Sequence, residues 1–117
     1  AGVPLVVVGH PDPLESRPLN LEEIAAVPGI DVFYIGQWDL SLALGLNPLR
    51  LPHPEVEAVI ERALEVGRKS GVAIGNGART PEDLRRNQAR GFTFLGHGPD
   101  YGLLAAAARA GVEAFER

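Results

Sequence analysis

Short apolar runs alternate along this chain with longer segments that have the periodicity of amphipathic helices. Four short runs rich in apolar residues are typical of buried strands; they cover residues 5–8, 32–35, 72–74 and 92–95. The segments between and after them predict four helices and one short helical turn; the helices cover 21–27, 54–70, 81–91 and 103–115, and the turn covers 40–44. This order predicts parallel strands joined by helical crossovers.

Polar, proline and glycine residues mark the predicted ends of the helices. Asn20 is a suitable N-cap for the first helix, and Thr80-Pro81, followed by acidic residues, is a strong helix start. Gly71 and Gly91 provide glycine stops after the second and third long helices. The helix assignments therefore rest on these terminal residues as well as on the apolar pattern.

The repeated strand–helix units predict an α/β fold in a single domain that spans residues 1–117. Four such units are half of a (β/α)₈ TIM barrel, which needs about 250 residues. A small open parallel sheet is the alternative architecture. The sequence pattern alone does not separate the two.

Composition removes several classes of function. The net charge is −4 and basic residues are not clustered, so nucleic-acid binding is not expected. The chain has no cysteine, which excludes disulfides and thiolate chemistry and leaves carboxylate, imidazole, carbonyl or water to hold a metal. Lys69, its single lysine, lies in a charged helical stretch, which argues against a Schiff base.

The apolar run at residues 3–8 is too short to span a membrane and has no basic flank of the kind that precedes a signal-peptide core. We therefore expect no membrane association, and we expect the cytoplasm as the location of the protein.

Proteins with parallel α/β folds place their sites where strands end and loops begin. Each predicted strand end carries glycine and polar residues; the four segments are Gly9-His10-Pro11-Asp12, Gly36-Gln37-Trp38-Asp39, Gly75-Asn76-Gly77 and Gly96-His97-Gly98-Pro99-Asp100. The glycines allow a ligand or a loop to approach the backbone. If the last two strands are strands seven and eight of a barrel, their paired glycines lie where many barrels bind phosphate.

Several of these side chains have two interpretations. Asp39 suits a hard divalent cation such as Mg²⁺ or Mn²⁺, or else it caps the turn at 40–44. His10 and His97 are candidate bases or ligands, or hydrogen-bonded structural residues. Trp38 either forms the wall of a small pocket or packs in the core.

A family resemblance joins these segments. The stretch from Asn20 to Asp31, the segment Phe33-Tyr-Ile-Gly-Gln-Trp-Asp-Leu-Ser41 and the segment Gly98-Pro-Asp-Tyr-Gly-Leu-Leu104 resemble the HpcH/HpaI aldolase family in order and spacing. The resemblance implies the C-terminal half of a phosphoenolpyruvate/pyruvate-type barrel. It also implies a class II aldolase, a lyase in which Mg²⁺, Mn²⁺ or Co²⁺ polarises a 2-keto acid that is cleaved to pyruvate and an aldehyde.

The resemblance also implies site residues. The metal aspartate of the family falls on Asp39, and the surrounding segment implies substrate binding by Gly36, Gln37, Trp38 and Ser41. Gln37 and Trp38 depart from the family, which has proline and a small residue or asparagine there.

The second metal ligand of the family, a glutamate, has no clear match in this chain. Glu15 and His10 are the candidates, and Asp12 lies between them.

A half barrel leaves two sheet edges and one sheet face without partners, so a homo-oligomer is expected. The resemblance adds a route, because similar barrels exchange their last helix between subunits. The alternative to an enzyme is an incomplete or non-catalytic half barrel that binds a ligand or serves in assembly.

Overall fold

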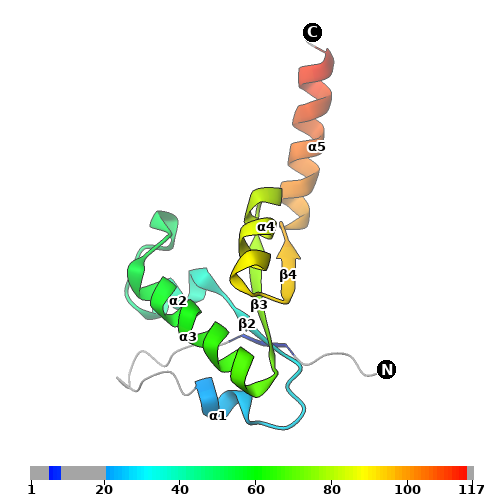
Figure 1. The fold of residues 1–117 in the computed structure, drawn as a ribbon. Coiled ribbons are helices and arrows are strands. Elements are labelled where there is room, and N and C mark those ends of the chain that lie inside the picture. Colours follow the sequence, from blue (N-terminus) through cyan, green and yellow to red (C-terminus); the bar gives the residue numbers. More distant parts are fainter. Residues whose placement is uncertain (1–5, 9–20, 116–117) are drawn as a thin grey trace.

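The computed structural model describes residues 6–8 and 21–115, which contain a parallel sheet with the strand order β1-β2-β3-β4 (Figure 1). The strands are β1 (Val6–Val8), β2 (Val32–Ile35), β3 (Ala73–Ala78) and β4 (Phe94–His97). Each strand pairs with the next one along the chain, so that Val32 is in register with both Val6 and Ala73. The predicted parallel α/β organisation is therefore confirmed for the described residues.

Helices follow the strands in the predicted alternation. They are α1 (Leu21–Ala25), α2 (Gln37–Ala43), the 3₁₀ helix η1 (Pro48–Arg50), α3 (Pro54–Ser70), α4 (Pro81–Arg90) and α5 (Asp100–Phe115). α3 and α4 lie on the same face of the sheet (Figure 1). Among the helices of the described residues, none has both the length and the apolar character that a membrane crossing requires.

The hydrophobic core lies between α3 and one face of β2 and β3. Val56 and Ile60 on α3 have no exposed surface, and they belong to one buried cluster with Phe33 and Ile74 from the strands. Successive side chains of a strand point to opposite faces. Tyr34, the residue after Phe33, therefore lies on the face that α3 does not cover.

Gly67 allows α3 to approach β3 closely. A Cβ atom at this position would lie 2.4 Å from Cγ1 of Ile74 and 3.0 Å from the carbonyl oxygen of Val72. Both distances are shorter than ordinary packing contacts, so the packing of helix on sheet depends on the missing side chain.

β3 is longer than the predicted strand 72–74, because it continues through Gly75, Asn76 and Gly77 to Ala78. The prediction that these glycines follow the strand is wrong. Glycine and asparagine are poor strand formers, and pairing with both neighbouring strands outweighs this preference.

The aromatic ring of Tyr34 takes up the space that these glycines leave. A Cβ atom at Gly75 would lie 2.7 Å from Cδ2 of Tyr34, and one at Gly77 would lie 3.1 Å from its hydroxyl oxygen. Phe94 of β4 meets the same ring edge to face, with 6.3 Å between the ring centroids. The predicted end of the fourth strand is wrong too, since Gly96 lies inside β4.

Several predicted helix boundaries also change. α1 ends at Ala25 instead of residue 27, α2 begins at Gln37 instead of residue 40, and α5 begins at Asp100 instead of residue 103. The two early starts have the same cause: each helix begins directly after a glycine or proline that follows a strand, before the apolar residues that suggested it.

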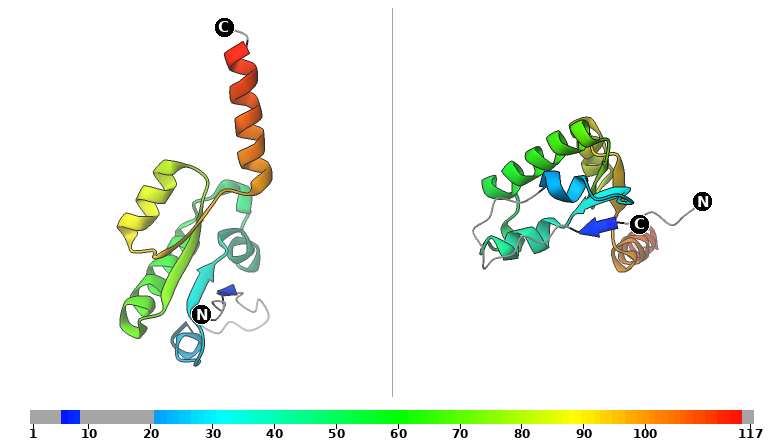
Figure 2. Two further views of the ribbon diagram at one scale, coloured as in Figure 1. Left: turned by 90° about the vertical axis from the view of Figure 1, so that its right-hand side faces the viewer. Right: turned by 90° about the horizontal axis from the view of Figure 1, so that it is seen from below.

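α5 extends away from the rest of the chain (Figure 2). None of its residues is buried, and Leu104 and Phe115 are 74% and 92% exposed. The described residues therefore leave this helix without a packing surface.

Candidate functional site

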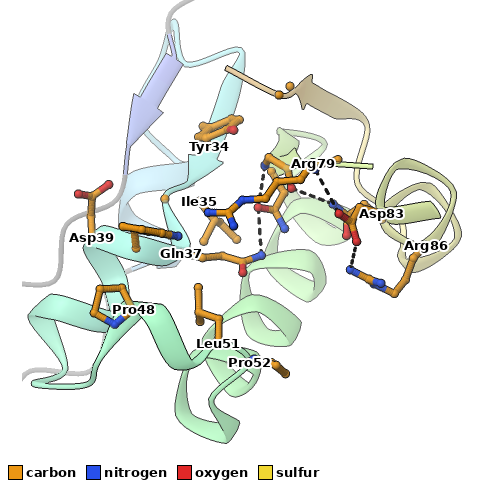
Figure 3. A pocket seen from close by; sticks show the side chains of 18 of the residues that line it. Tyr34, Ile35, Gln37, Asp39, Pro48, Leu51, Pro52, Arg79, Asp83 and Arg86 are labelled. Carbon is orange, nitrogen blue, oxygen red and sulfur yellow. Dashed lines mark hydrogen bonds and ion pairs between the residues drawn. The ribbon is translucent and has the colours of Figure 1, made fainter. Parts of the chain in front are cut away.

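A cleft of about 1100 Å³ lies at the carboxyl ends of β2 and β3 (Figure 3). One wall comes from the start of α2, and another comes from the end of β3 and the adjoining part of α4. This is the edge of the sheet where parallel α/β proteins place their sites. The predicted segment 36–39 lies in this cleft, as does Asn76-Gly77.

Asp39 lies in the first turn of α2, where the positive end of the helix dipole favours a carboxylate. It is not the N-cap, because Gly36 holds that position and accepts a hydrogen bond at 2.9 Å from the backbone N–H of Leu40. The interpretation of Asp39 as a cap is therefore wrong. The side chain is exposed and has no hydrogen-bond or ion-pair partner among the described residues.

Figure 3 shows the carboxylate of Asp39 pointing away from Arg79, Asp83 and Arg86. It is therefore free to bind a ligand on a different side of α2 from the charged side chains of α4. Its role as a metal ligand stays a prediction.

Asn76 is a buried polar residue in the wall of the cleft, with 2% of its surface exposed. Its Oδ1 accepts hydrogen bonds from Nε2 of Gln37 at 3.2 Å and from the backbone N–H of Gly77 at 2.8 Å. Its Nδ2 is buried without a partner among the described residues. Such orphan donors are uncommon in proteins and are expected to meet water or a ligand.

Trp38 is 44% exposed and lines the cleft, so the interpretation of this residue as part of the core is wrong. The guanidinium of Arg79 lies over its ring, with 5.6 Å between Cζ and the ring centroid. This is the geometry of a cation–π interaction.

The other predicted substrate-binding residue, Ser41, has no exposed surface. Its hydroxyl donates a hydrogen bond at 2.7 Å to the carbonyl oxygen of Gln37 and therefore stabilises the first turn of α2. Its direct role in substrate binding stays a prediction.

Two further arginines line the cleft, and both are paired with carboxylates. Arg86 contacts Asp83 at 2.5 Å, and Arg90 contacts Glu57 at 2.7 Å and Glu61 at 2.8 Å. Arg79 differs, since no carboxylate among the described residues lies within ion-pair distance of its guanidinium.

The pKa values of Tyr34 and Asp83, which both line the cleft, are shifted from their ordinary values. Burial raises the pKa of the Tyr34 phenol, which therefore stays protonated and able to donate a hydrogen bond at neutral pH. Desolvation alone would raise the pKa of Asp83, but hydrogen bonds from the backbone and side chains of Arg79, Thr80 and Arg86 lower it.

The remaining predicted site residues are not brought together. His97 ends β4 and is exposed. His10, Asp12 and Glu15 lie outside the described residues. Within residues 6–8 and 21–115, no three histidine, aspartate or glutamate side chains are placed to hold a metal ion.

Sequence reasoning did not assign a role to Asn76 or Arg79. The segment Gly75-Asn76-Gly77 was singled out because of its glycines, and nothing in the sequence distinguished Arg79 from the other arginines. The signal that identifies both residues is three-dimensional, because each contacts a residue in the first turn of α2 that is about forty positions earlier in the chain.

Comparison with known proteins gives a consistent result. A model of the family described as HpcH/HpaI aldolase/citrate lyase matches residues 15–107. The chain is 38% identical over 99 residues to a hydroxypyruvate/pyruvate aldolase of Chromohalobacter salexigens, which covers 83% of this chain and 38% of that protein. It is 41% identical over 93 residues to a 4-hydroxy-2-oxo-heptane-1,7-dioate aldolase of Escherichia coli, which covers 78% of this chain and 34% of that protein.

A solved structure agrees with these matches. The crystal structure of a family protein with the same description, from Burkholderia cenocepacia, superposes with a TM-score of 0.80 at 30% identity. The match covers 98% of this chain and 43% of that one. The chain thus spans well under half the length of the relatives that it matches, and its fold corresponds to part of theirs.

Proposed function

Since the chain belongs to the HpcH/HpaI aldolase/citrate lyase family, we propose that it is part of a divalent-metal-dependent lyase. The proposed reaction cleaves a 2-keto acid to pyruvate and an aldehyde. The relatives described above are named as aldolases, which supports the reaction class. The barrel of such an enzyme would be completed by residues outside the described part of this chain.

One observation carries the proposal. Asp39 presents an exposed carboxylate at the carboxyl end of β2, without a hydrogen-bond or ion-pair partner among the described residues. Carboxylate oxygen is the ligand that hard divalent cations prefer. The described residues supply this one ligand and not a complete site, so Glu15 or His10 is proposed as the second ligand.

The neighbouring residues have proposed roles in holding the keto acid. A bound Mg²⁺, Mn²⁺ or Co²⁺ supplies Lewis-acid polarisation of its carbonyl group. The backbone of Gly36 and the carboxamide of Gln37 orient the carboxylate end of the substrate, and Ser41 fixes the position of Gln37 through its carbonyl oxygen. The exposed face of Trp38 excludes water from one side of the site.

Metal binding tests the role of Asp39. We expect Mn²⁺ to bind the wild-type chain weakly, because one described carboxylate makes a poor site, and we expect Asp39→Asn to weaken binding by more than about tenfold. Isothermal titration calorimetry measures both affinities. Glu113→Gln on α5 is the matched control, since it removes the same charge far from the cleft. Equal affinity in wild type and Asp39→Asn would refute the assignment.

A second candidate function is favoured by the isolation of Asp39 within the described residues. In it, the chain is an incomplete or non-catalytic half barrel that binds a ligand or serves in assembly. A cleavage assay with a 4-hydroxy-2-keto acid distinguishes the two functions. Robust metal-dependent cleavage by the 117-residue chain alone supports the lyase, whereas trace activity supports the half barrel.

A homo-oligomer is also part of the proposal. The sheet has two edge strands, β1 and β4, and α5 has no packing surface in the described residues. A second copy of the chain would pair or cover these elements.

A further inference from the structure

We propose that Arg79, Trp38 and Asn76 form an oxyanion-binding site in the cleft, which takes the carboxylate or phosphate group of a small acid. We call it the Arg79–Trp38 site. If the proposed lyase function holds, this anionic group belongs to the substrate part that leaves as the aldehyde. The binding property itself requires neither a metal nor turnover.

The charge of Arg79 is available for a ligand. Arg86 and Arg90, which also line the cleft, are neutralised by Asp83 and by Glu57 with Glu61. The guanidinium of Arg79 has no such carboxylate among the described residues, and its contact is the ring of Trp38. Among the arginines of the cleft, it is therefore the one whose charge calls for an external anion.

The contact with Trp38 also orients the guanidinium. A guanidinium that lies over an aromatic face keeps its N–H groups directed outward in its own plane, where they match the two oxygens of a carboxylate or phosphate. Figure 3 shows the side chain of Arg79 reaching from the end of β3 toward the start of α2, across the cleft. The carboxylate of Asp39 points away from it, so that it does not repel the bound anion.

Asn76 supplies an independent indication of a ligand. Among the residues that the structure describes, both hydrogen bonds of its side chain use Oδ1, which fixes the amide so that Nδ2 is the group without a partner there. A buried N–H donor of a residue that lines the cleft needs an acceptor, and in this proposal the oxyanion that binds Arg79 provides it. Gln37, which holds Oδ1, precedes Trp38 in the first turn of α2 and links the two parts of the site.

Anion titrations of the 117-residue chain test the proposal, with EDTA present to remove metal. Succinate and inorganic phosphate are the probes, and chloride at equal ionic strength is the reference. Calorimetry measures affinity, and the fluorescence of Trp38 reports the place of binding, since the chain has one tryptophan. We expect millimolar affinity or better for at least one probe, with a change in Trp38 emission. The probe that binds more tightly identifies the carboxylate or the phosphate as the ligand class.

Two substitutions assign the binding to these residues. Arg79→Gln is expected to weaken binding by about tenfold or more, because charge-assisted bidentate hydrogen bonds are lost, whereas Arg79→Lys keeps the charge and loses less. Asn76→Asp keeps the acceptor for Gln37 and Gly77 but replaces Nδ2 with a carboxylate oxygen, so it is expected to abolish binding. Arg68→Gln on α3 is the matched control, since it removes an equal charge outside the cleft.

Any of three results would overturn the proposal: no binding of either probe by the wild-type chain, equal binding by wild type and Arg79→Gln, or an equal loss in Arg68→Gln. Circular dichroism establishes that each variant is folded. If Asn76→Asp does not fold, the comparison of Arg79→Gln with Arg79→Lys carries the test. Failure of the lyase assay leaves these results unchanged, so the two proposals fail separately.

Discussion

At the scale of single residues, Gly67 sets the distance between α3 and the sheet. Replacement of a helical glycine by alanine normally stabilises a helix by about 1 kcal/mol. At Gly67 the added methyl group would meet Ile74, which is buried and β-branched, and the backbone of Val72. Overpacking of this kind typically costs roughly 1–3 kcal/mol, which outweighs the gain in propensity.

We therefore expect Gly67→Ala to lower the free energy of unfolding by about 1 kcal/mol or more. Urea denaturation followed by circular dichroism measures the change. Gly111→Ala in α5 is the matched control, because a Cβ atom there has no neighbour within 4 Å. It should leave stability unchanged or raise it slightly. Equal effects of the two substitutions would show that Gly67 does not limit the packing.

The residues of the site were accessible to sequence reasoning to different degrees. Asp39 and its segment were predicted as candidates because the local sequence places a carboxylate a few positions after a buried strand. For Trp38 the sequence left a pocket wall and the core as alternatives, and the buried amide of Asn76 was not predicted. The contacts that decide both are made across the cleft, by Arg79 with Trp38 and by Gln37 with Asn76. Such contacts between distant segments leave no periodic trace in the sequence.

At the scale of elements, α4 has the most completely satisfied N-terminus of the described helices that carry a side-chain cap. Thr80 accepts a hydrogen bond from the backbone N–H of Asp83 at 3.1 Å, and the carboxylate of Asp83 accepts one from the backbone N–H of Thr80 at 3.1 Å. This capping box confirms the predicted helix start. It also connects the cleft to the helix, because Asp83 accepts a hydrogen bond from the backbone of Arg79.

The capping box predicts acid sensitivity of α4. The pKa of Asp83 is lower in the folded chain than its ordinary value, so its contribution to stability is complete above the ordinary carboxyl pKa of about 4. It is lost as the pH falls through the lowered folded-state pKa. We expect Asp83→Asn to reduce this loss, measured as the difference in denaturation midpoint between pH 7 and pH 3. Glu82→Gln, on the same turn but outside the capping box, should retain the wild-type pH dependence.

Some boundaries of helices and strands follow from local sequence, and others are set by packing between elements. The helix starts at Pro54 and Pro81 were predicted correctly, because cap and proline chemistry is local. The extension of β3 to Ala78 was not, because its stability there comes from pairing with both neighbours and from the ring of Tyr34. Residues 75–78 of β3 are small and pack against an aromatic ring of the neighbouring strand, so their own sequence does not show the pattern of a strand.

At the scale of the whole molecule, the described chain is less compact than an isolated domain of its length. Its radius of gyration is 16.6 Å, whereas about 13 Å is typical of a compact domain of 100 residues. α5 accounts for much of the extension (Figure 1). Helical spacing places Tyr101, Leu104, Val112 and Phe115 on one side of this helix, and all four are more than half exposed.

We expect this apolar stripe to be covered by a second copy of the chain. Light scattering over a concentration series should give a mass above the 12.5 kDa of one chain. Leu104→Glu should shift the equilibrium toward the monomer, because a charge replaces apolar surface that association buries at roughly 25 cal/mol per Å². Ala106→Glu, which lies on the opposite side of α5, is the matched control.

A constant mass of one chain at all concentrations would contradict the homo-oligomer. So would an equal effect of Leu104→Glu and Ala106→Glu, because the stripe would then have no special role in association.

The exposure of α5 also has a consequence for its own conformation. Helix formation is cooperative with a costly nucleus, and helices without tertiary contacts are marginal in water below about 12–15 residues even when they are rich in alanine. α5 has 16 residues, no buried side chain and two glycines, Gly102 and Gly111. We therefore expect the winding of α5 and its burial against a second copy to be linked, so that the free energy that completes the helix is part of the free energy of assembly. In that case, dissociation and unwinding of this segment are one thermodynamic event.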